Sequence, residues 1–418
     1  MSRKPRLEAL LSRYSTSDRR TLSYDLPAGI CVGVFNGLSI TFVGIIGRRI
    51  GLDAAMLTVL SVSAFVGLLL NLWIGHLSAR GRLEAWVLWS GLGSRIIAGF
   101  ALIWVSPWLY LSIMSLFNIV SSFGGPAYAS IMRSAYSDRH RGELMGYVRV
   151  FIQTSTALSA ALAGALMQTF PGSQRLLFPL AAVFGVVSSL LFYRIKVQAA
   201  EGEGGPAPGA AAAGGPDEGF RASVASLLRD RRFIAYMAVY FVIGFADKIV
   251  VPLEPIRFVD ELGMTYAEAG LVTGTVPLVG ALVGYLVYAK AAARVNPFLA
   301  LFVTTLLSST RFINTALAGT SFELIPGAFL SGMSNAGWDL IPIFSLILFA
   351  QGRRLSLYFG FHATLVGLRG LIGPVVGAWL YTGLGLSIST IYLIAYASIL
   401  LGAVLLYLFY LAVRRRGG

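Results

Sequence analysis

The chain has 418 residues, of which 56% are hydrophobic and 12% are charged, and its formal net charge is +14. This composition excludes an ordinary soluble domain, which carries about 25% charged residues. The single cysteine, Cys31, excludes a disulfide within the chain and a thiolate metal site, and the three histidines are too far apart to suggest a metal cluster.

Twelve apolar stretches follow one another along the chain, and each is long enough for a membrane-spanning helix, which needs about 20 residues. The first six spans are predicted at 26–47, 55–75, 85–105, 107–130, 142–168 and 175–195. The other six are predicted at 233–256, 266–289, 297–318, 324–350, 356–381 and 386–411. Because a helix satisfies its own backbone hydrogen bonds in lipid, the sequence predicts an all-α membrane protein.

The spans form two halves of nearly equal length. A basic N-terminal segment, 1–24, precedes a six-helix bundle at 25–198, and a second six-helix bundle, 233–411, is followed by a basic tail, 412–418. Between the bundles lies 199–232, which begins with a run of Gly, Pro, Ala and acidic residues. That run has too little hydrophobicity to fold, so we expect a flexible linker.

Internal repetition supports a duplicated design. Arg141 and Arg354 are each followed 23 residues later by a Gly-Ala pair, and the shared offset aligns Arg149 with His362. Many secondary transporters consist of two such related halves, with the substrate site at their interface.

The basic residues are strongly asymmetric across the predicted membrane. Of the 33 Lys and Arg, 24 lie on the side that holds both termini, four lie on the opposite side and five lie within spans. The positive-inside rule therefore predicts that both termini are cytoplasmic. We expect the protein to lie in the cytoplasmic membrane of a bacterium or archaeon. The basic loops are interpreted as topology signals, and we expect no nucleic-acid partner.

Two loops on that side carry recognisable motifs. After the second span the chain reads Gly75-His-Leu-Ser-Ala-Arg80-Gly81-Arg82, and after the fourth span Arg141-Gly142 leads into the fifth. With the twelve spans, this arrangement resembles the major facilitator superfamily, although Ala79 stands where the family has an acidic residue. The resemblance implies two six-helix bundles that rock about a central site by alternating access.

Charged residues within spans are costly, roughly 2.5–3.5 kcal/mol at the membrane centre on insertion scales, and are therefore functional candidates. The seventh span holds Asp247 and Lys248 near its middle and Glu254 between Pro252 and Pro255. Adjacent residues point about 100° apart on a helix, so we expect Asp247 and Lys248 to meet different neighbours. Asp247 is a candidate for binding a proton or a substrate, and Glu254 is a candidate gate. A structural salt bridge is the alternative.

The tenth and eleventh spans carry three further candidates. Asp339 and Arg369 lie at similar depth and are predicted to pair, because an unpaired buried charge is costly. His362 has the intrinsic pKa of a proton-exchange group, and an interfacial hydrogen bond is its alternative role.

The remaining span charges are all arginines. Arg149 and Gln153 share a face of the fifth span, where Arg149 would bind an anion, latch the gate or extend toward the interface. Arg95 and Arg311 are expected to form structural pairs or to reach the interface.

Uncharged polar and aromatic side chains complete the candidate site. Trp338 lies near the middle of the tenth span and is interpreted as facing a cavity or packing between helices. Three asparagines are candidates for lining the cavity or for bonding between helices; they are Asn36, Asn118 and Asn335.

Together these observations predict a secondary active transporter for a small organic solute, coupled to protons, without a cofactor or an enzymatic activity. No GxxxxGK[ST] phosphate loop is present. An excess of basic span residues favours an anionic or zwitterionic solute. The first predicted span lacks the acidic residue that is common in drug/proton antiporters, which argues against a standard exporter of cationic drugs. An amphiphile exporter is the alternative. A membrane sensor or lipid scramblase is the alternative from another class. We expect the protein to be a monomer. Besides the solute and protons, its expected partners are membrane lipids.

Overall fold

The computed structural model describes residues 13–79, 82–137, 139–195, 227–291, 295–350 and 355–414. Every regular element within these ranges is helical, as the sequence predicts. Residues 1–12, most of the predicted linker and the last four residues lie outside the described parts. Eight helices in these parts are long and apolar enough to cross a membrane.

Each half contains six helical segments, several of them interrupted. The first half consists of α2 Thr16–Leu38, continued by η1 Ile40–Phe42 and α3 Val43–Arg49; α4 Ala54–Ala79; α5 Leu83–Gly99; α6 Pro107–Ser122, continued by α7 Gly125–Ala135; α8 Arg141–Thr169; and α9 Gln174–Tyr193. The second half consists of α11 Arg231–Val250, continued by α12 Glu254–Ile256 and η2 Arg257–Glu261; α13 Tyr266–Ala269, continued by η3 Gly270–Thr275 and α14 Val276–Ala291; α15 Pro297–Leu317; η4 Phe322–Leu324 with α16 Ile325–Ala350; α17 Leu355–Ala378 with η5 Trp379–Gly383; and α18 Ile388–Arg414.

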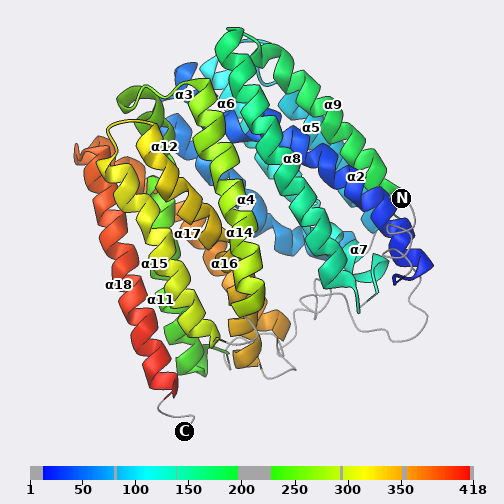
Figure 1. The fold of residues 1–418 in the computed structure, drawn as a ribbon, viewed down its shortest axis with the longest axis vertical. Coiled ribbons are helices and arrows are strands. Elements are labelled where there is room, and N and C mark those ends of the chain that lie inside the picture. Colours follow the sequence, from blue (N-terminus) through cyan, green and yellow to red (C-terminus); the bar gives the residue numbers. More distant parts are fainter. Residues whose placement is uncertain are drawn as a thin grey trace, which may run out of the picture.

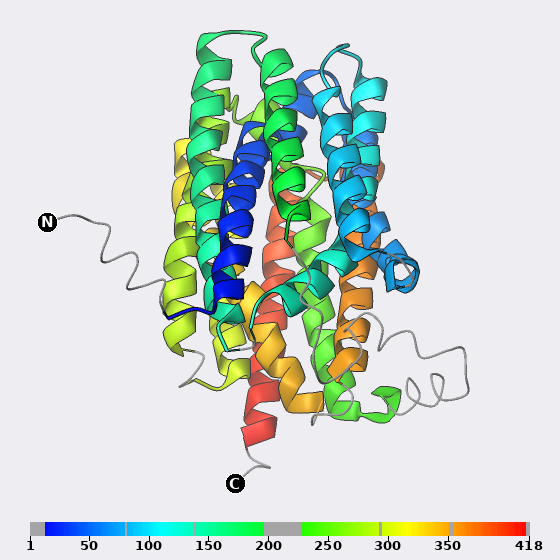
Figure 2. The ribbon, with the colours of Figure 1, turned by 90° about the vertical axis from the view of Figure 1, so that its right-hand side faces the viewer.

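The two halves stand side by side, with α2 to α9 in one group and α11 to α18 in the other (Figure 1). The start of α2 and the end of α18 lie on the same side of the molecule, as Figure 2 also shows. We call this the terminal side and the opposite one the distal side.

Helix contacts repeat from one half to the other. Within the first half α2 packs on α8 and α9, α4 packs on α6, and α5 packs on α6 and α9. The equivalent contacts in the second half are those of α11 with α17 and α18, α14 with α16, and α15 with α16 and α18. This correspondence supports the duplication inferred from the sequence.

Individual loop residues repeat as well. Gly51 and Gly263, 212 residues apart, both have a positive φ that favours glycine, and each ends a distal turn. Asp53 then accepts a hydrogen bond from the Met56 N–H, and Thr265 accepts one from the Glu268 N–H. Both side chains cap the helix that follows, so the same turn chemistry starts the second span of each half.

The apolar core shows where the halves join. One cluster on the distal side combines buried side chains from both halves, among them Phe42, Tyr110 and Phe312. On the terminal side each half has a cluster of its own, one around Tyr136 and one around Tyr236. The halves therefore share a core at the distal side and separate toward the terminal side.

Polar contacts close the distal side further. Arg48 forms an ion pair with Asp260, and Arg49 donates a hydrogen bond to the Met264 carbonyl while its guanidinium lies 3.8 Å from the centre of the Tyr266 ring. We call these contacts the distal latch. Arg48 and Asp260 are 212 residues apart, so the ion pair joins equivalent positions of the two halves.

Glycine stripes allow close helix packing. Gly33 and Gly37 of α2 face backbone carbonyls of α8 within the first half. On α17, Gly370 faces Phe65 of α4 across the two halves, and Gly377 faces the Ile249 carbonyl of α11. A side chain at any of these positions would separate the helices.

Candidate functional site

An ionic cluster lies in the second half, where the seventh helical segment is interrupted. Arg311 of α15 contacts the Asp247 carboxylate of α11 at 3.6 Å and the Glu254 carboxylate of α12 at 2.5 Å. The Lys248 ammonium lies 2.7 Å from the same Asp247 carboxylate. We call these four residues the ionic cluster. The prediction that Asp247 and Lys248 meet different neighbours is wrong, because the flexible Lys248 stem folds back to its own neighbour.

The break in the seventh segment makes this arrangement possible. The segment leaves α-helical geometry after Val250 and resumes at Glu254, as expected around Pro252, which has no backbone N–H to donate. The interruption brings Glu254 within reach of the arginine that also holds Asp247. Arg311 therefore has carboxylate partners, in agreement with the structural pairing expected for it.

Arg369 of α17 lies close to the cluster and has a different environment. Its side chain is 91% buried, donates a hydrogen bond to the Tyr240 carbonyl at 3.1 Å and lies 4.9 Å from the centre of the Tyr240 ring. Its Nε has no hydrogen-bond partner, and no ion pair joins it to the described residues. Gly244 leaves the space that its guanidinium fills.

Two other candidates pack around the same tyrosine. The Trp338 ring lies 5.4 Å and the His362 ring 4.7 Å from the centre of the Tyr240 ring. The His362 Nε2 is buried without a hydrogen-bond partner among the described residues. The structure thus brings Trp338, His362 and Arg369, from α16 and α17, around one aromatic side chain of α11.

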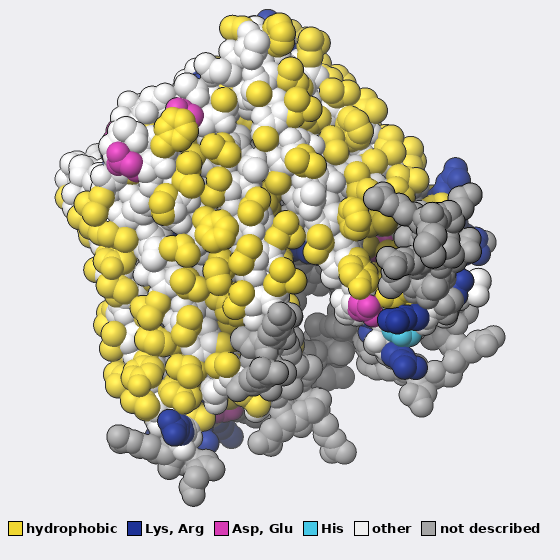
Figure 3. Space-filling model, in the orientation of Figure 1, with side chains coloured by type: hydrophobic (Ala, Val, Ile, Leu, Met, Phe, Trp, Pro, Cys, Tyr) yellow, Lys and Arg dark blue, Asp and Glu magenta, His cyan; other side chains and the backbone are white. Residues whose placement is uncertain are grey.

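The predicted pair between Asp339 and Arg369 is wrong. Asp339 instead accepts a hydrogen bond from Tyr285 at 2.5 Å and lies 3.9 Å from the Arg149 guanidinium of the first half. Asp339 and Arg149 are half-exposed, with 52% and 58% of their side chains accessible. They belong to the terminal side of the molecule, where Figure 3 shows the surface notched between the two halves.

Comparison with known proteins places this architecture in a family. Residues 26–246, more than half of the chain, match the family model described as Major Facilitator Superfamily. The chain belongs to the Major Facilitator Superfamily. It is therefore a multi-pass membrane protein of a transporter family, as its sequence resemblance implied.

Solved structures agree with this fold over almost the whole chain. A mutant of the nucleoside transporter NupG superposes with a TM-score of 0.67 at 12% identity, covering 93% of this chain and all of that one. An inward-facing, unoccupied bacterial homologue of the human lysosomal transporter Spinster gives 0.65 at 14% identity, covering 96% and 98%. At such identities the likeness concerns the twelve-helix fold alone.

One curated relative matches part of the sequence. The multidrug resistance protein MdtH of Aeromonas hydrophila subsp. hydrophila is 27% identical over 150 residues. The match spans 36% of this chain and 37% of the relative's length.

Only part of the loop motif lies in the described residues. Gly75 belongs to α4 and Arg82 immediately precedes α5, whereas Arg80 and Gly81 are outside the described parts. Arg141 begins α8, where it donates a hydrogen bond to the Tyr136 carbonyl at 3.3 Å, and Gly142 has open space around its Cα.

The uncharged polar candidates do not gather at one point. Asn118 of α6 donates a hydrogen bond to Ser63 of α4 at 2.9 Å, which is a contact between helices of one half. Asn36 of α2 and Gln153 of α8 are partly buried, and Asn335 of α16 is exposed. Asn118 therefore has the packing role that was its alternative.

Sequence analysis missed a buried carboxyl in the first span. Because α2 begins at Thr16, Asp25 lies inside this helix, and the interpretation that the first span contains no acid is wrong. Asp25 is 3% exposed, accepts a hydrogen bond from the Tyr136 hydroxyl at 2.8 Å and forms no ion pair with the described residues. The signal was present: Ser15 caps the helix, and the acidic Asp18 three residues later marks a helix start.

Proposed function

We propose that this protein is a secondary active transporter that moves a small anionic or zwitterionic organic solute by alternating access, coupled to protons. The observation that carries the solute class is the excess of positive charge beside the central helices. Lys248, Arg311 and Arg369 face only two carboxylates, those of Asp247 and Glu254, among the described residues.

Arg369 is the proposed anchor for the solute. Its guanidinium is buried and forms no ion pair with the described residues, and a planar guanidinium is suited to binding a carboxylate or phosphate with two hydrogen bonds. The start of α17 is 14 residues before Arg369, or about 21 Å at 1.5 Å per residue. That depth is consistent with a site near the middle of a bilayer core, which is about 30 Å thick.

The distribution of contacts supports alternating access. The distal side is held by a shared core and the distal latch, whereas each half has its own core on the terminal side. If the termini are cytoplasmic, as the basic loops predict, this is an inward-facing state. Arg149 of the first half and Asp339 of the second lie 3.9 Å apart, and this contact between the halves would change as they rock.

Proton coupling is proposed to involve Asp25, beside the earlier candidates Asp247, Glu254 and His362. Asp247 and Glu254 already have cationic partners that stabilise their charged forms. Among the described residues Asp25 has a single donor, the Tyr136 hydroxyl, and a buried carboxylate with so little compensation is costly until it binds a proton. Asp25, on the first helix, is therefore added to the proposed proton-coupling residues.

A thermal-shift screen followed by flux measurements tests the solute class. Small carboxylates, sugar phosphates and amino acids form one panel, with nucleosides and cationic dyes for comparison. A true substrate at 100 times its Kd stabilises the fold by about 2.7 kcal/mol. Arg369→Gln is expected to weaken binding of an anionic hit about 10-fold to 100-fold, since a charged hydrogen bond contributes about 1.5–3 kcal/mol. Arg175→Gln, at an exposed distal position, serves as the control. Stabilisation by dyes alone would contradict the proposal.

A second experiment separates proton coupling from binding. In proteoliposomes, Asp25→Asn is expected to abolish accumulation driven by a pH gradient while solute exchange without a gradient continues. Asp247→Asn is expected to weaken both, because it leaves Lys248 without its carboxylate partner and Arg311 with Glu254 alone. Unchanged driven accumulation in Asp25→Asn would refute its role.

Multidrug efflux remains the second candidate function. The partial match to the multidrug resistance protein MdtH and the acid in the first helix favour it. Proton-dependent dye extrusion from inverted vesicles, lost in Asp25→Asn, is its expected signature. Absence of driven flux for every compound would point to the sensor or scramblase alternative.

A further inference from the structure

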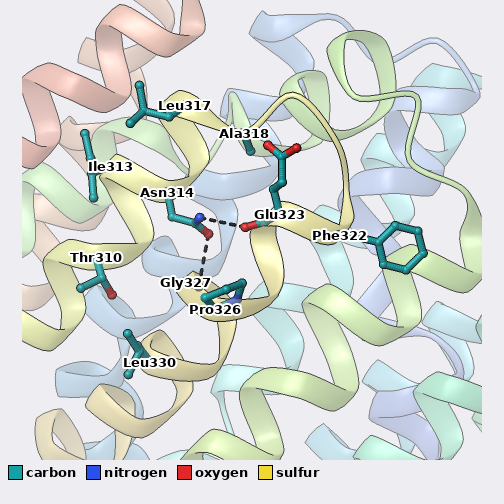
Figure 4. Close-up of a pocket in the computed structure, with 10 residues that line it drawn as sticks. All are labelled: Thr310, Ile313, Asn314, Leu317, Ala318, Phe322, Glu323, Pro326, Gly327 and Leu330. Carbon is teal, nitrogen blue, oxygen red and sulfur yellow. Dashed lines mark hydrogen bonds between the residues drawn. The ribbon is translucent and has the colours of Figure 1, made fainter.

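A groove opens on the outer face of the second half, at the distal ends of α15 and α16. It has a volume of about 700 Å³ and is lined by apolar side chains that include Ile313, Leu317, Phe322 and Leu330 (Figure 4). Glu323 is the one charged residue among those that line it.

The groove is separate from the ionic cluster, although both involve α15. Thr310, Ile313, Asn314 and Leu317 recur at helical spacing and form one face of α15. Phe312 and Thr315 are buried on the other face of this helix. Leu317 is 71% and Phe322 59% exposed, which places apolar surface where the helix ends meet the edge of a membrane.

The walls of the groove are tied to each other. The Asn314 amide donates a hydrogen bond to the Glu323 carbonyl at 2.8 Å and accepts one from the Gly327 N–H at 3.2 Å (Figure 4). Gly327 leaves the space that the Asn314 side chain needs, because a Cβ there would collide with it. The groove is thus held open by its own hydrogen bonds.

The mouth of the groove carries an uncompensated negative charge. The Glu323 carboxylate accepts hydrogen bonds from the Gly319 N–H at 2.9 Å and the Thr320 hydroxyl at 3.1 Å. These donors hold the pKa of Glu323 below its ordinary value. No cation of the described residues pairs with it, and the nearby Arg257 is paired with Glu261.

We propose that this groove binds one phospholipid of the distal leaflet whose headgroup carries a primary ammonium. The ammonium pairs with the Glu323 carboxylate, and one acyl chain lies along Leu317, Ile313 and Leu330. The face of α15 from Leu317 to Thr310 covers about 10 Å at 1.5 Å per residue, which accommodates the upper part of a chain. An anionic headgroup would be repelled by the same carboxylate.

Native mass spectrometry of the full chain from nanodiscs of equal parts phosphatidylethanolamine and phosphatidylglycerol tests this site. We expect the wild-type protein to retain phosphatidylethanolamine several-fold over phosphatidylglycerol. Glu323→Gln is expected to abolish that preference. Asp53→Asn should leave it unchanged, because Asp53 is a distal carboxylate outside the groove that, like Glu323, accepts a hydrogen bond from a backbone N–H.

A second variant addresses the acyl chain. Leu330→Trp fills the groove and is expected to reduce retention of both lipids, with thermal unfolding as the check that the fold is intact. Equal retention of the two lipids by the wild type, or an unchanged preference in Glu323→Gln, would overturn the proposal. So would a dimer through this face that persists after the lipid is removed.

Discussion

Arg311 is the residue on which the ionic cluster depends. It contacts carboxylates on both sides of the interruption in the seventh segment, Asp247 before it and Glu254 after it. Its side chain is 24% exposed, and those of its partners are 32% and 27% exposed. The cluster is therefore intermediate between a surface pair, which contributes little, and a buried pair, which is costly to break.

Among the described residues, removing the arginine should leave Glu254 without a cationic partner and Asp247 with Lys248 alone. We expect Arg311→Gln to lower the free energy of unfolding by roughly 1–3 kcal/mol, the penalty for unsatisfied charged groups. The double variant Arg311→Gln with Glu254→Gln should recover part of that loss, and Arg175→Gln should change it by under about 0.5 kcal/mol. Thermal or chemical unfolding in detergent measures all three. Equal stability of Arg311→Gln and wild type would contradict this prediction, because it would show that solvent stabilises the carboxylates of the cluster as well as Arg311 does.

At the scale of single residues, the sequence identified charged candidates within the spans but not how they pair. Asp339 and Arg369 were predicted to lie at similar depth and to pair, yet Asp339 meets Arg149 of the other half and Arg369 packs on Tyr240. Depth follows from counting residues along a helix. Partner choice depends on how each helix is rotated about its axis and how far its side chains reach, and hydropathy contains neither quantity.

At the scale of elements, glycine determines how closely α2 approaches α8. A Cβ at Gly33 would meet the Ile152 carbonyl and lie 2.8 Å from the Ser155 Cβ. Gly29, Gly33 and Gly37 recur every fourth residue on one face of α2, and the structure shows that the helix on the other side is α8. Close packing of this kind is rigid, so added volume is poorly accommodated.

Gly33→Val tests this packing. We expect it to destabilise the protein by about 1–3 kcal/mol, the usual cost of overpacking. Gly146→Ala is the matched control, because it lies on α8 and a Cβ there meets no atom within 4 Å. It should be neutral or stabilise by up to about 1 kcal/mol through helix propensity. Similar melting temperatures for Gly33→Val and Gly146→Ala would contradict the packing argument.

Helix boundaries show the same division between sequence and structure. Hydropathy predicted the first span from residue 26, whereas α2 begins at Thr16 with Ser15 as its cap. The polar first turns of this helix carry no hydropathy signal, and for that reason Asp25 was missed. Interruption of the seventh segment near Pro252 was predictable because proline lacks the donor that a continuous helix needs.

At the scale of the whole molecule, the distal latch joins the two halves at equivalent positions. Arg48 and Asp260 occupy the same place in the repeat, so their ion pair lies close to the axis that relates the halves. Their side chains are 27% and 36% exposed, which makes this a modest contact. A modest contact is suited to a conformational equilibrium, where differences of a few kcal/mol separate the states.

Charge reversal tests the role of the latch. With Cys31→Ser as background, a cysteine at Thr41, whose side chain faces Gly274 of the other half, reports access from the distal side. Arg48→Asp should raise the rate of labelling by an impermeant maleimide about threefold to tenfold, since like charges replace an ion pair that contributes up to about 1 kcal/mol. Adding Asp260→Arg should restore the original rate. Labelling that is insensitive to both changes would show that the shared core alone closes this side.

The sequence by itself determined the class of this protein: an all-α chain of twelve spans in two related halves, with a central group of charges in the second half. The number of spans and their repetition follow from length and hydropathy, which can be read residue by residue along the chain. Tertiary structure alone decided which charges meet, that Asp25 is buried beneath Tyr136, and that the halves join at the distal side. Those facts depend on contacts between residues distant in sequence, where a small rotation of one helix exchanges one partner for another.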